Sequence, residues 1–544
     1  MPQCISTDVL IVGGGPVGLT VAYSLARKGV ASLLVEQHDK DLQAMYGRAT
    51  TLYPRTLEML DQLDLLDELN QIGYAGRNSV TFKDGRRVTT RGWHKMFEAM
   101  HGTYLDYCLN IRQKYSEEVI RQSYQKLGGE PYIGWKLESF SLDHESEDEH
   151  KVASQSMVRR LANIPFEGER TTHRWVRIDG RFRTNMPDAD LGFASIESKH
   201  HGNVLWVQLD HGVKRIGFAM TKEMLAKYGD WLTEEDAKQE AVKSMEPFTL
   251  EFESIDWCTL YSINQRVANT YISNDRAILA GDACHTHSSG AAQGMNTGVH
   301  DAVNLAWKLG GTIKGWYAKG VLETYDSERR PAAHRLIQLD KAFSAVISGQ
   351  IPGSCKGQYT DTNELFTKLF NETIQFSIGL GIHYNENVIN LPSTTGMISA
   401  GWRAPDALVY PPGSRLPVRL FNLTKNFGQW YVLILAGQPS ETKANLAIAV
   451  EALSALVTRL PRDMIRFVTV AAQNMTQGDR FFSIPRLGYL CFDQDQSAHA
   501  AYTISPGRGA VVALRPDGIL AHATALDEVE SAISFLSGLT GVAP

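Results

Sequence analysis

Apolar and polar positions repeat along the chain with two periods, and these periods divide it into structural elements. Residues 8–12 and 31–35 are short apolar runs, whereas residues 20–28 repeat apolar side chains at helical spacing. This order is typical of two buried parallel strands joined by a crossover helix. A third apolar run, residues 276–280, precedes a small-residue loop and a long amphipathic helix. We therefore expect an α/β domain built on a parallel sheet.

The turn after the first apolar run has the GxGxxG spacing, with Gly13, Gly15 and Gly18 ahead of a helix that Pro16 opens. The three glycines allow a tight turn, close approach of a pyrophosphate, and close packing of helix on strand. Anions are favoured at such a helix start. Glu36 ends the second strand, where the fingerprint places an acceptor for a ribose hydroxyl. The pattern predicts a site for FAD or NAD, the alternative being a βαβ unit that binds nothing.

The third apolar run leads to a second set of candidate residues. Asp282 stands at the carboxyl end of this strand, where open α/β sheets bind ligands, and can hold a sugar-like hydroxyl. The following helix opens around Gly294, Met295 and Asn296, so its free N–H groups can stabilise an anion. We expect the glycine turn and Asp282 to bind one dinucleotide between them.

Composition narrows the class of protein. The 544 residues are too many for one core and indicate about three domains. A net charge of -6 without a basic run argues against a nucleic-acid partner. The six cysteines lie far apart with no CxxC pair, which argues against a disulfide framework or zinc site. With no signal peptide or membrane-length apolar run evident, we expect a cytoplasmic protein that binds neither metal nor membrane.

On three segments the chain resembles the FAD-dependent aromatic hydroxylases, the flavoprotein monooxygenases of the para-hydroxybenzoate and phenol hydroxylase type. The segments are the glycine turn with Glu36, residues 47–69, and AGDACHTHSSGAAQGMNTG at 280–298, which is specific to the family. The resemblance implies a Rossmann-like FAD-binding domain with an inserted antiparallel-sheet substrate domain. It also implies that Asp282 holds the flavin ribityl chain and that residues 294–296 face the pyrimidine edge of the ring.

The same resemblance assigns further site residues. Arg48 matches the arginine on the pyrophosphate side, and Gln113, beside Arg112, matches a position that contacts the flavin. Tyr261 lies on the strand leading to a segment, residues 265–267, that usually lines the aromatic pocket. Tyr261 is therefore a candidate catalytic residue that orients substrate, and the alternative is a buried tyrosine with a satisfied hydroxyl.

The resemblance also implies the domain organisation. The tail resembles the thioredoxin-like domain of phenol hydroxylases, but without CxxC it cannot do dithiol chemistry, so we expect it to serve packing or a homodimer. The expected divisions are an FAD-binding domain at 1–75, 105–165 and 270–350, a substrate-binding domain at 76–104 and 166–269, a helical connector at 351–397, and the thioredoxin-like α/β domain at 398–544.

One motif departs from the family pattern. Most members carry a strand that ends in Gly-x-Asp-Gly before a Ser-x-Val-Arg helix start. Here residues 156–159 keep the helix start, whereas Val152 and Ala153 occupy the Asp-Gly positions and the strand is judged absent. A missing interior strand would leave backbone groups unpaired. Two explanations stay open: a deletion in this sequence, or closure of the sheet by another segment with impaired flavin reduction.

The activity that the resemblance implies is monooxygenation. NAD(P)H would reduce FAD transiently, O2 would form a flavin C4a-hydroperoxide, and this would hydroxylate a phenolic or enolic, aromatic or polyketide-like molecule of specialised metabolism. The motifs leave open Baeyer–Villiger, epoxidising or dearomatising chemistry, and also a catalytically impaired flavin-binding protein. An NAD-dependent dehydrogenase is disfavoured, because Asp282 and the loop at 290–298 would then have no role.

Overall fold

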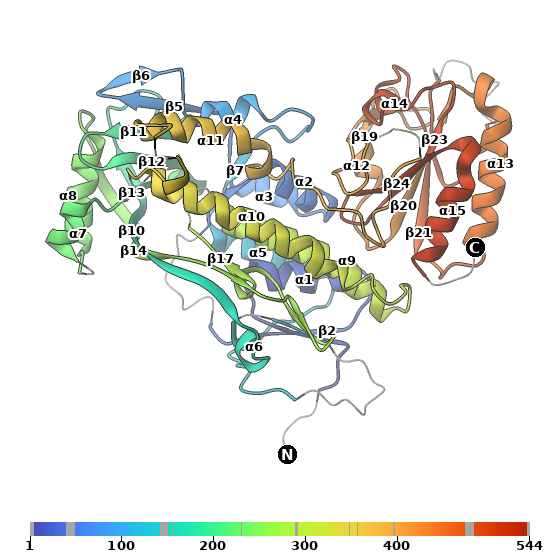
Figure 1. Ribbon diagram of the computed structural model, residues 1–544, viewed down its shortest axis with the longest axis horizontal. Helices are drawn as coiled ribbons and strands as arrows, with labels where there is room; N and C mark the ends of the chain where they lie inside the picture. The colour runs from blue at the N-terminus through green and yellow to red at the C-terminus, as the bar shows by residue number, and fades with distance from the viewer. Residues whose placement is uncertain are drawn as a thin grey trace.

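The computed structural model describes residues 5–39, 49–141, 151–154, 156–229, 231–288, 292–347, 349–355, 357–394, 398–473 and 484–540. Figure 1 shows an N-terminal α/β layer in the lower centre, a large sheet at the upper left and a C-terminal α/β unit at the right. The long helix α10 (Thr324–Ile347) runs across the middle and lies beside the first two parts.

The N-terminal layer is a six-stranded sheet in the order β15-β16-β9-β1-β2-β8. Neighbouring strands are parallel except β15 and β16. Its strands are β1 (Val9–Val12), β2 (Ser32–Glu36), β8 (Tyr132–Ile133), β9 (Lys151–Ser154), β15 (Ile272–Ser273) and β16 (Ala277–Leu279). Helix α1 (Pro16–Ala26) connects β1 to β2 and packs against α5 (Gln113–Lys126) and α9 (Gln293–Ile313). This confirms the α/β domain on a parallel sheet that the apolar runs predict, and it is consistent with the Rossmann-like domain that the resemblance implies.

No strand is expected before Val152, and residues 142–150 lie outside the described residues, but the interior of the sheet is not left open. Residues 151–154 form β9, which pairs in parallel with β1 on one side and with β16 on the other. The register places Val152 beside Leu10 and Ala277. Strand pairing is made by backbone N–H and C=O groups, so loss of the Asp-Gly side chains does not remove the strand. The interior of the sheet is therefore closed by the residues at the Asp-Gly positions themselves, which agrees with the second of the two explanations as far as closure of the sheet is concerned.

The second sheet has eight strands in the order β17-β14-β10-β13-β12-β11-β5-β6, and its neighbours are antiparallel except β11 with β5. The strands are β5 (Asn78–Lys83), β6 (Arg86–Val88), β10 (Phe166–Arg183), β11 (Gly192–Ser198), β12 (Gly202–Gln208), β13 (Lys214–Ala219), β14 (Glu251–Ala268) and β17 (His285–Thr286). Helices α7 (Lys222–Tyr228) and α8 (Glu234–Met245) cover one face, where they share a core with β10. The opposite face is available to line a cavity.

Short elements connect the two sheets. A third sheet has three strands in the order β3-β7-β4, and its strands alternate along the chain with strands of the two larger sheets. These strands and the neighbouring helices are β3 (Thr51–Leu52), β4 (Tyr74–Gly76), β7 (Cys108–Asn110), α2 (Pro54–Gln62), α3 (Leu66–Ile72), α4 (His94–Glu98), α6 (Ser156–Leu161) and α11 (Thr362–Ser377). Helix α11 packs against α10, and its Phe366 and Phe370 share an apolar cluster with Trp93. This cluster closes one end of the region between the sheets.

The C-terminal unit is a five-stranded mixed sheet in the order β22-β21-β20-β23-β24. Its main strands and helices are β20 (Trp430–Gly437), β21 (Ile465–Ala471), β22 (Tyr489–Phe492), β23 (Ala510–Leu514), β24 (Leu520–Ala525), α13 (Pro439–Val457) and α15 (Val529–Gly538). The pair β20–β21 is parallel and the pair β20–β23 is antiparallel. Trp430 packs edge-on against Trp307 of α9, so this unit has a direct apolar contact with the N-terminal part.

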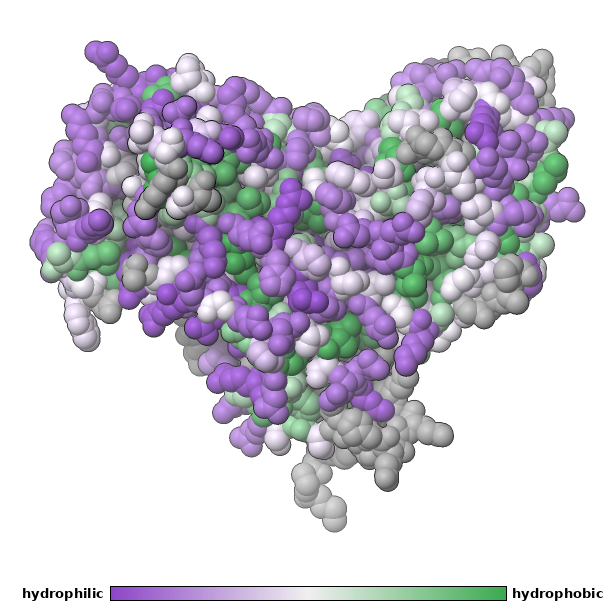
Figure 2. Space-filling view, in the orientation of Figure 1, coloured by the Kyte–Doolittle hydropathy of each residue, from purple (hydrophilic) through white to green (hydrophobic). Residues whose placement is uncertain are grey.

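The visible face of the molecule consists mostly of polar residues. Figure 2 shows hydrophilic residues over most of one face, with apolar residues scattered among them. Within the described ranges, no helix is long and apolar enough to cross a membrane.

Candidate active site

A cavity of about 800 Å³ lies where the N-terminal sheet meets the eight-stranded sheet. One wall is formed by the glycine turn, the segment around Thr50, Asp282 and the start of α9. The opposite wall is formed by side chains of the eight-stranded sheet: Arg177, Phe193, Leu205, Val207, Arg215, Trp257, Thr259 and Tyr261. This volume is within the usual range for small-molecule and cofactor sites, roughly 300–1,000 Å³.

The glycine turn is built as the GxGxxG spacing predicts. Gly13 has a φ of 110°, a region that favours glycine, and a Cβ on Gly18 would lie 2.0 Å from the carbonyl oxygen of Gly13. A Cβ on Gly15 would meet nothing within 4 Å. Gly13, Gly15, Pro16 and Gly18 all line the cavity. Helix α1 therefore begins against the cavity with its first N–H groups available to an anion.

Glu36 lies at the end of β2, behind the glycine turn. Its Oε2 accepts a hydrogen bond from the backbone N–H of Gly14 at 2.7 Å, and its Oε1 accepts one from the N–H of His38 at 2.9 Å. Glu36 is buried and is not among the residues that line the cavity. In this structure it holds the turn in shape, and its contact with a ribose stays a prediction.

Asp282 lies in a short 3-10 turn, Gly281–Ala283, directly after β16, and its exposed side chain lines the cavity. The turn is held from behind by Asp301, whose Oδ2 accepts the N–H of Gly281 at 3.1 Å. Asp301 is fully buried and also bonds His285 at 2.8 Å and Arg329 at 2.7 Å. Burial alone would raise the pKa of Asp301, but Arg329 and His285 hold that pKa to about 2. The Asp282 turn thus rests on the buried carboxylate of Asp301 and on its partners His285 and Arg329.

The three residues predicted at the start of α9, Gly294, Met295 and Asn296, have two different roles in the structure. Gly294 and Met295 line the cavity, and a Cβ on Gly294 would meet nothing within 4 Å. Asn296 is buried; its Oδ1 accepts the N–H of Tyr53 at 2.9 Å, and its amide donates to the carbonyl of Thr51 at 2.8 Å. The Asn296 side chain therefore fixes the start of α9 against the 51–53 segment and does not line the cavity.

Arg112 and Gln113 also differ in position. Gln113 lines the cavity, and its amide donates to Glu117 at 2.7 Å. The Arg112 guanidinium instead bonds Asp210 at 2.7 Å and Asp256 at 2.7 Å, and Arg112 does not line the cavity. A buried arginine shared by two carboxylates has its charge already compensated. The structure thus gives Arg112 the role of joining α5 to the eight-stranded sheet. Arg48 lies outside the described residues.

Tyr261 projects from β14 into the cavity and packs near Trp175 on the adjacent strand, with ring centroids 6.5 Å apart. Burial raises the pKa of Tyr261, so its hydroxyl keeps its proton. A protonated phenol at the wall of an aromatic cavity can donate a hydrogen bond to a substrate oxygen.

A family model described as FAD binding domain matches residues 6–340, which is more than half of the chain. The chain belongs to the FAD-dependent aromatic hydroxylases. A second model, described as phenol hydroxylase, C-terminal dimerisation domain, matches residues 382–542. The resemblance read from the sequence is confirmed, and the cofactor of this family is FAD.

Named relatives of this hydroxylase are enzymes. The FAD-dependent monooxygenase hkm7 of Aspergillus hancockii is 28 % identical over 414 residues, 70 % of this chain and 74 % of the relative. The 3-hydroxybenzoate 4-monooxygenase of Comamonas testosteroni is 28 % identical over 483 residues, 79 % of this chain and 74 % of the relative. The structure of aklavinone-11 hydroxylase with FAD and aklavinone is 20 % identical, covers 99 % of this chain and 100 % of its own, and has a TM-score of 0.73. That likeness shows the fold.

The cavity of this hydroxylase fits FAD. The empty space at Gly15 and Gly294 leaves room for a ligand to approach both helix starts, and Asp282 offers an exposed carboxylate between them. The sequence predicts these positions because the glycines meet local backbone requirements and Asp282 directly follows an apolar strand. It does not indicate Asp301 and Arg329, which support the Asp282 turn from within two helices and carry no motif signal.

Proposed function

We propose that this hydroxylase consumes NAD(P)H and O2 to hydroxylate a phenolic or enolic small molecule. One observation carries the proposal: the glycine turn, Asp282 and the aromatic wall with Tyr261 line a single cavity. A cofactor held at the first two features and a substrate held at the third would therefore share one space. Direct transfer of oxygen from the cofactor to the substrate requires that both lie in the same cavity.

The chain's own residues would bind the cofactor, orient the substrate and keep water out of the cavity. Gly15 and the start of α1 would hold the diphosphate, Asp282 the ribityl hydroxyls, and Gly294 with Met295 the edge of the flavin ring. When bound and reduced, FAD would supply the activation of O2 for transfer of one oxygen atom to the substrate. Tyr261 would donate a hydrogen bond to a substrate oxygen and so orient the ring.

The names of relatives support an aromatic substrate for this cavity. One relative is named for 3-hydroxybenzoate, and one structural neighbour is a complex with aklavinone. Trp257 and Phe193 line the cavity here and offer apolar surface to an aromatic ring. We infer a role in specialised metabolism from the same relatives. Against the alternative of a catalytically impaired flavin-binding protein stands the intact sheet, because β9 fills the place of the strand expected to be missing.

The experiment that tests the proposal begins with the purified protein and its absorbance spectrum. We expect a yellow protein whose NAD(P)H oxidation and O2 uptake rise when a phenolic substrate from a panel is added. With ¹⁸O2, one labelled oxygen should appear as a hydroxyl on carbon. A label in a new ester or epoxide would support Baeyer–Villiger or epoxidising chemistry instead. A colourless protein that takes up no FAD would contradict the proposal.

We further propose that the C-terminal unit has a thioredoxin-like fold and joins two copies of the chain. Support for the fold comes from the strand order β21-β20-β23-β24, with β23 antiparallel to β20. Support for the dimer comes from the matching family model, which is described as a dimerisation domain. The domain boundaries at 75, 105, 165, 270, 350 and 398 are part of this proposal. Sedimentation of the full chain should give the mass of a dimer, and a monomer at micromolar concentration would contradict it.

A further inference from the structure

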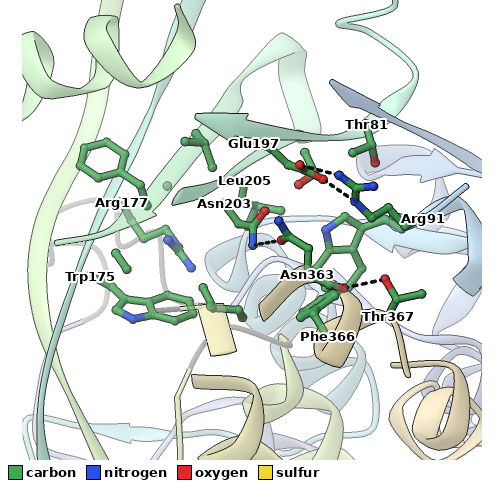
Figure 3. A pocket seen from close by; sticks show the side chains of 18 residues that line it. Thr81, Arg91, Trp175, Arg177, Glu197, Asn203, Leu205, Asn363, Phe366 and Thr367 are labelled. Atoms are coloured by element: carbon green, nitrogen blue, oxygen red, sulfur yellow. Dashed lines mark hydrogen bonds and ion pairs between the residues drawn. The ribbon is translucent and has the colours of Figure 1, made fainter. Parts of the chain in front are cut away.

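Arg177 is a buried cation at the junction of two cavities. It lines the large cavity, and it also lines a smaller cavity of about 60 Å³ over the same face of the eight-stranded sheet. Figure 3 shows its side chain directed into this smaller pocket, next to Trp175. The two cavities also share Trp93 and Leu205, so Arg177 belongs to the boundary between them.

The charge of Arg177 has little compensation from the protein. Only 3 % of the residue is exposed, and within the described part of the chain its guanidinium has one hydrogen bond, from Nη1 to the carbonyl oxygen of Val176 at 3.2 Å. Its guanidinium also lies 4.8 Å from the centre of the Trp175 ring. Among the residues that the structure describes, no carboxylate forms an ion pair with it. Burial lowers the pKa of Arg177, and the charge of Arg215 acts in the same direction, whereas Tyr261 and the carboxylate of Asp179 act in the opposite direction without reversing the shift.

The neighbouring arginine provides a contrast in the same sheet. Arg215 stands opposite Asp179 in the β10–β13 register, and its Nε and Nη2 donate to the two carboxylate oxygens of Asp179 at 2.6 and 2.8 Å. Arg177 stands opposite Gly217. The sheet therefore pairs one of its two cavity-lining arginines with a carboxylate and places the other opposite a residue without a side chain.

Gly217 also provides the space that the guanidinium needs. A Cβ at Gly217 would lie 2.2 Å from Nη1 of Arg177 and 2.7 Å from its Cζ. The other charged groups at the small cavity are already satisfied, since Arg91 makes a bidentate pair with Glu197 at 2.7 and 2.8 Å. Figure 3 shows this pair on the far wall from Arg177. Arg177 is thus the cation at this wall with donors left for a ligand.

We propose that Arg177 binds an anionic oxygen group of the substrate, so that the substrate is an acid rather than a neutral phenol. An unpaired buried charge destabilises a fold, and its retention in a cavity is explained by a ligand of opposite charge. The planar fork of a guanidinium matches a carboxylate with two parallel bonds, and an ionised enol with one. This inference rests on the proposed function, because it assigns the substrate class of the same cavity.

The test compares acids with neutral partners of the same shape. FAD-loaded protein is titrated with 3-hydroxybenzoate and 3-hydroxybenzamide, and with 6-hydroxy-2-naphthoate and 6-hydroxy-2-naphthamide, while the flavin absorbance is followed. We expect each acid to bind more tightly than its amide. In Arg177→Met the acids should lose about 10- to 100-fold in affinity, the usual effect of a bond to a charged group, while the amides change little.

Two further variants distinguish the effect of the positive charge at position 177 from the effect of where the guanidinium lies. Gly217→Ala keeps the positive charge but displaces the guanidinium, so it should also weaken the acids selectively. Arg177→Lys should restore part of the preference. The melting temperature checks folding: Arg177→Met should not lower it, whereas Arg215→Met should, because it leaves Asp179 buried without its partner.

The outcomes distinguish this inference from the proposed function. If amides bind as well as acids, if the acids do not bind, or if Arg177→Met weakens both members of a pair equally, the anion site is wrong. FAD affinity and NAD(P)H oxidation are measured on the same samples. Failure to bind FAD would instead overturn the proposed function, whereas normal FAD binding without acid preference would overturn only the role of Arg177.

Discussion

The Oε1 atom of Glu328 lies 2.6 Å from Nη1 of Arg515, although 187 positions separate the two residues in the chain. Glu328 also pairs with Lys308 at 2.8 Å, and Arg515 pairs with Asp517 at 2.6 Å. All four side chains are at most 1 % exposed. These bonds join α9 and α10 of the N-terminal part to the β23–β24 hairpin of the C-terminal unit.

Removing one member of this buried cluster should be costly. Arg515→Met leaves two carboxylates without their principal partner, and such losses are typically about 3–5 kcal/mol. We expect a lower melting temperature and a lower urea midpoint for the full chain. Arg462→Met is the control, because Arg462 is almost fully exposed and should leave both unchanged. An unaltered midpoint in Arg515→Met would show that the cluster does not couple the two parts.

The carboxylate of Asp282 should contribute to FAD affinity. Asp282→Asn keeps the shape of the turn but removes a charge-assisted acceptor, so the dissociation constant for FAD should rise about 10- to 100-fold. Fluorescence quenching during titration of the apoprotein with FAD measures this. Asp188→Asn, a surface aspartate paired with Arg87, is the matched control. Equal affinities for all three proteins would exclude Asp282 from the cofactor site.

Tyr261 should affect the substrate and not the cofactor. Because burial raises the pKa of its hydroxyl, the group stays a donor across the neutral range. Tyr261→Phe removes that donor and should lower kcat/KM about 10-fold while leaving FAD affinity intact. Tyr489→Phe, a substitution at an exposed position in the C-terminal sheet, serves as the comparison. If kcat/KM does not change, the hydroxyl has a structural role only.

Lys28 should make the protein more stable at alkaline pH. Burial, with smaller contributions from Arg27 and Lys314, lowers the pKa of Lys28 to about 7. In the unfolded chain that pKa is about 10.4, so folding is opposed by protonation of Lys28 below pH 7, and this penalty fades as the pH rises. Between pH 7 and 9 the relief is about 2 kcal/mol. The urea midpoint should rise over this range in the natural chain.

The control for this prediction is Lys28→Met, which cannot titrate at that position. Its urea midpoint should change less between pH 7 and 9 and should be the higher of the two at pH 7. The same pH dependence in both proteins would assign the effect to other groups.

The sequence predicts the glycine turn, Asp282 and the start of α9 well because each depends on local backbone geometry. Gly18 must lack a Cβ because that atom would lie 2.0 Å from the carbonyl oxygen of Gly13. Such a requirement is readable from spacing alone. The sheet around these turns follows from the apolar runs that precede them.

The role of a side chain cannot be predicted from spacing in the sequence when its partners lie far away in the chain. Arg112 sits beside a family motif, yet its guanidinium bonds Asp210, from the turn between β12 and β13, and Asp256, from β14. Arg177 lies on a strand where polar residues at alternate positions indicate a solvent-exposed face. In the folded chain α10 and α11 pack over that face of the eight-stranded sheet, and the face becomes the wall of a cavity.

Strand β9 is not evident from the sequence for a related reason, because its pairing depends on backbone groups of strands far away in the chain, and its presence has a geometric consequence. Adjacent strands in a sheet are about 4.8 Å apart, so one intervening strand holds the carboxyl ends of β1 and β16 about 10 Å from each other. The four residues from Lys151 to Ser154 thus act as a spacer between the turn that follows each outer strand. Deleting the spacer would bring the two turns together and leave no gap for an extended molecule to bridge, even with every glycine and Asp282 intact.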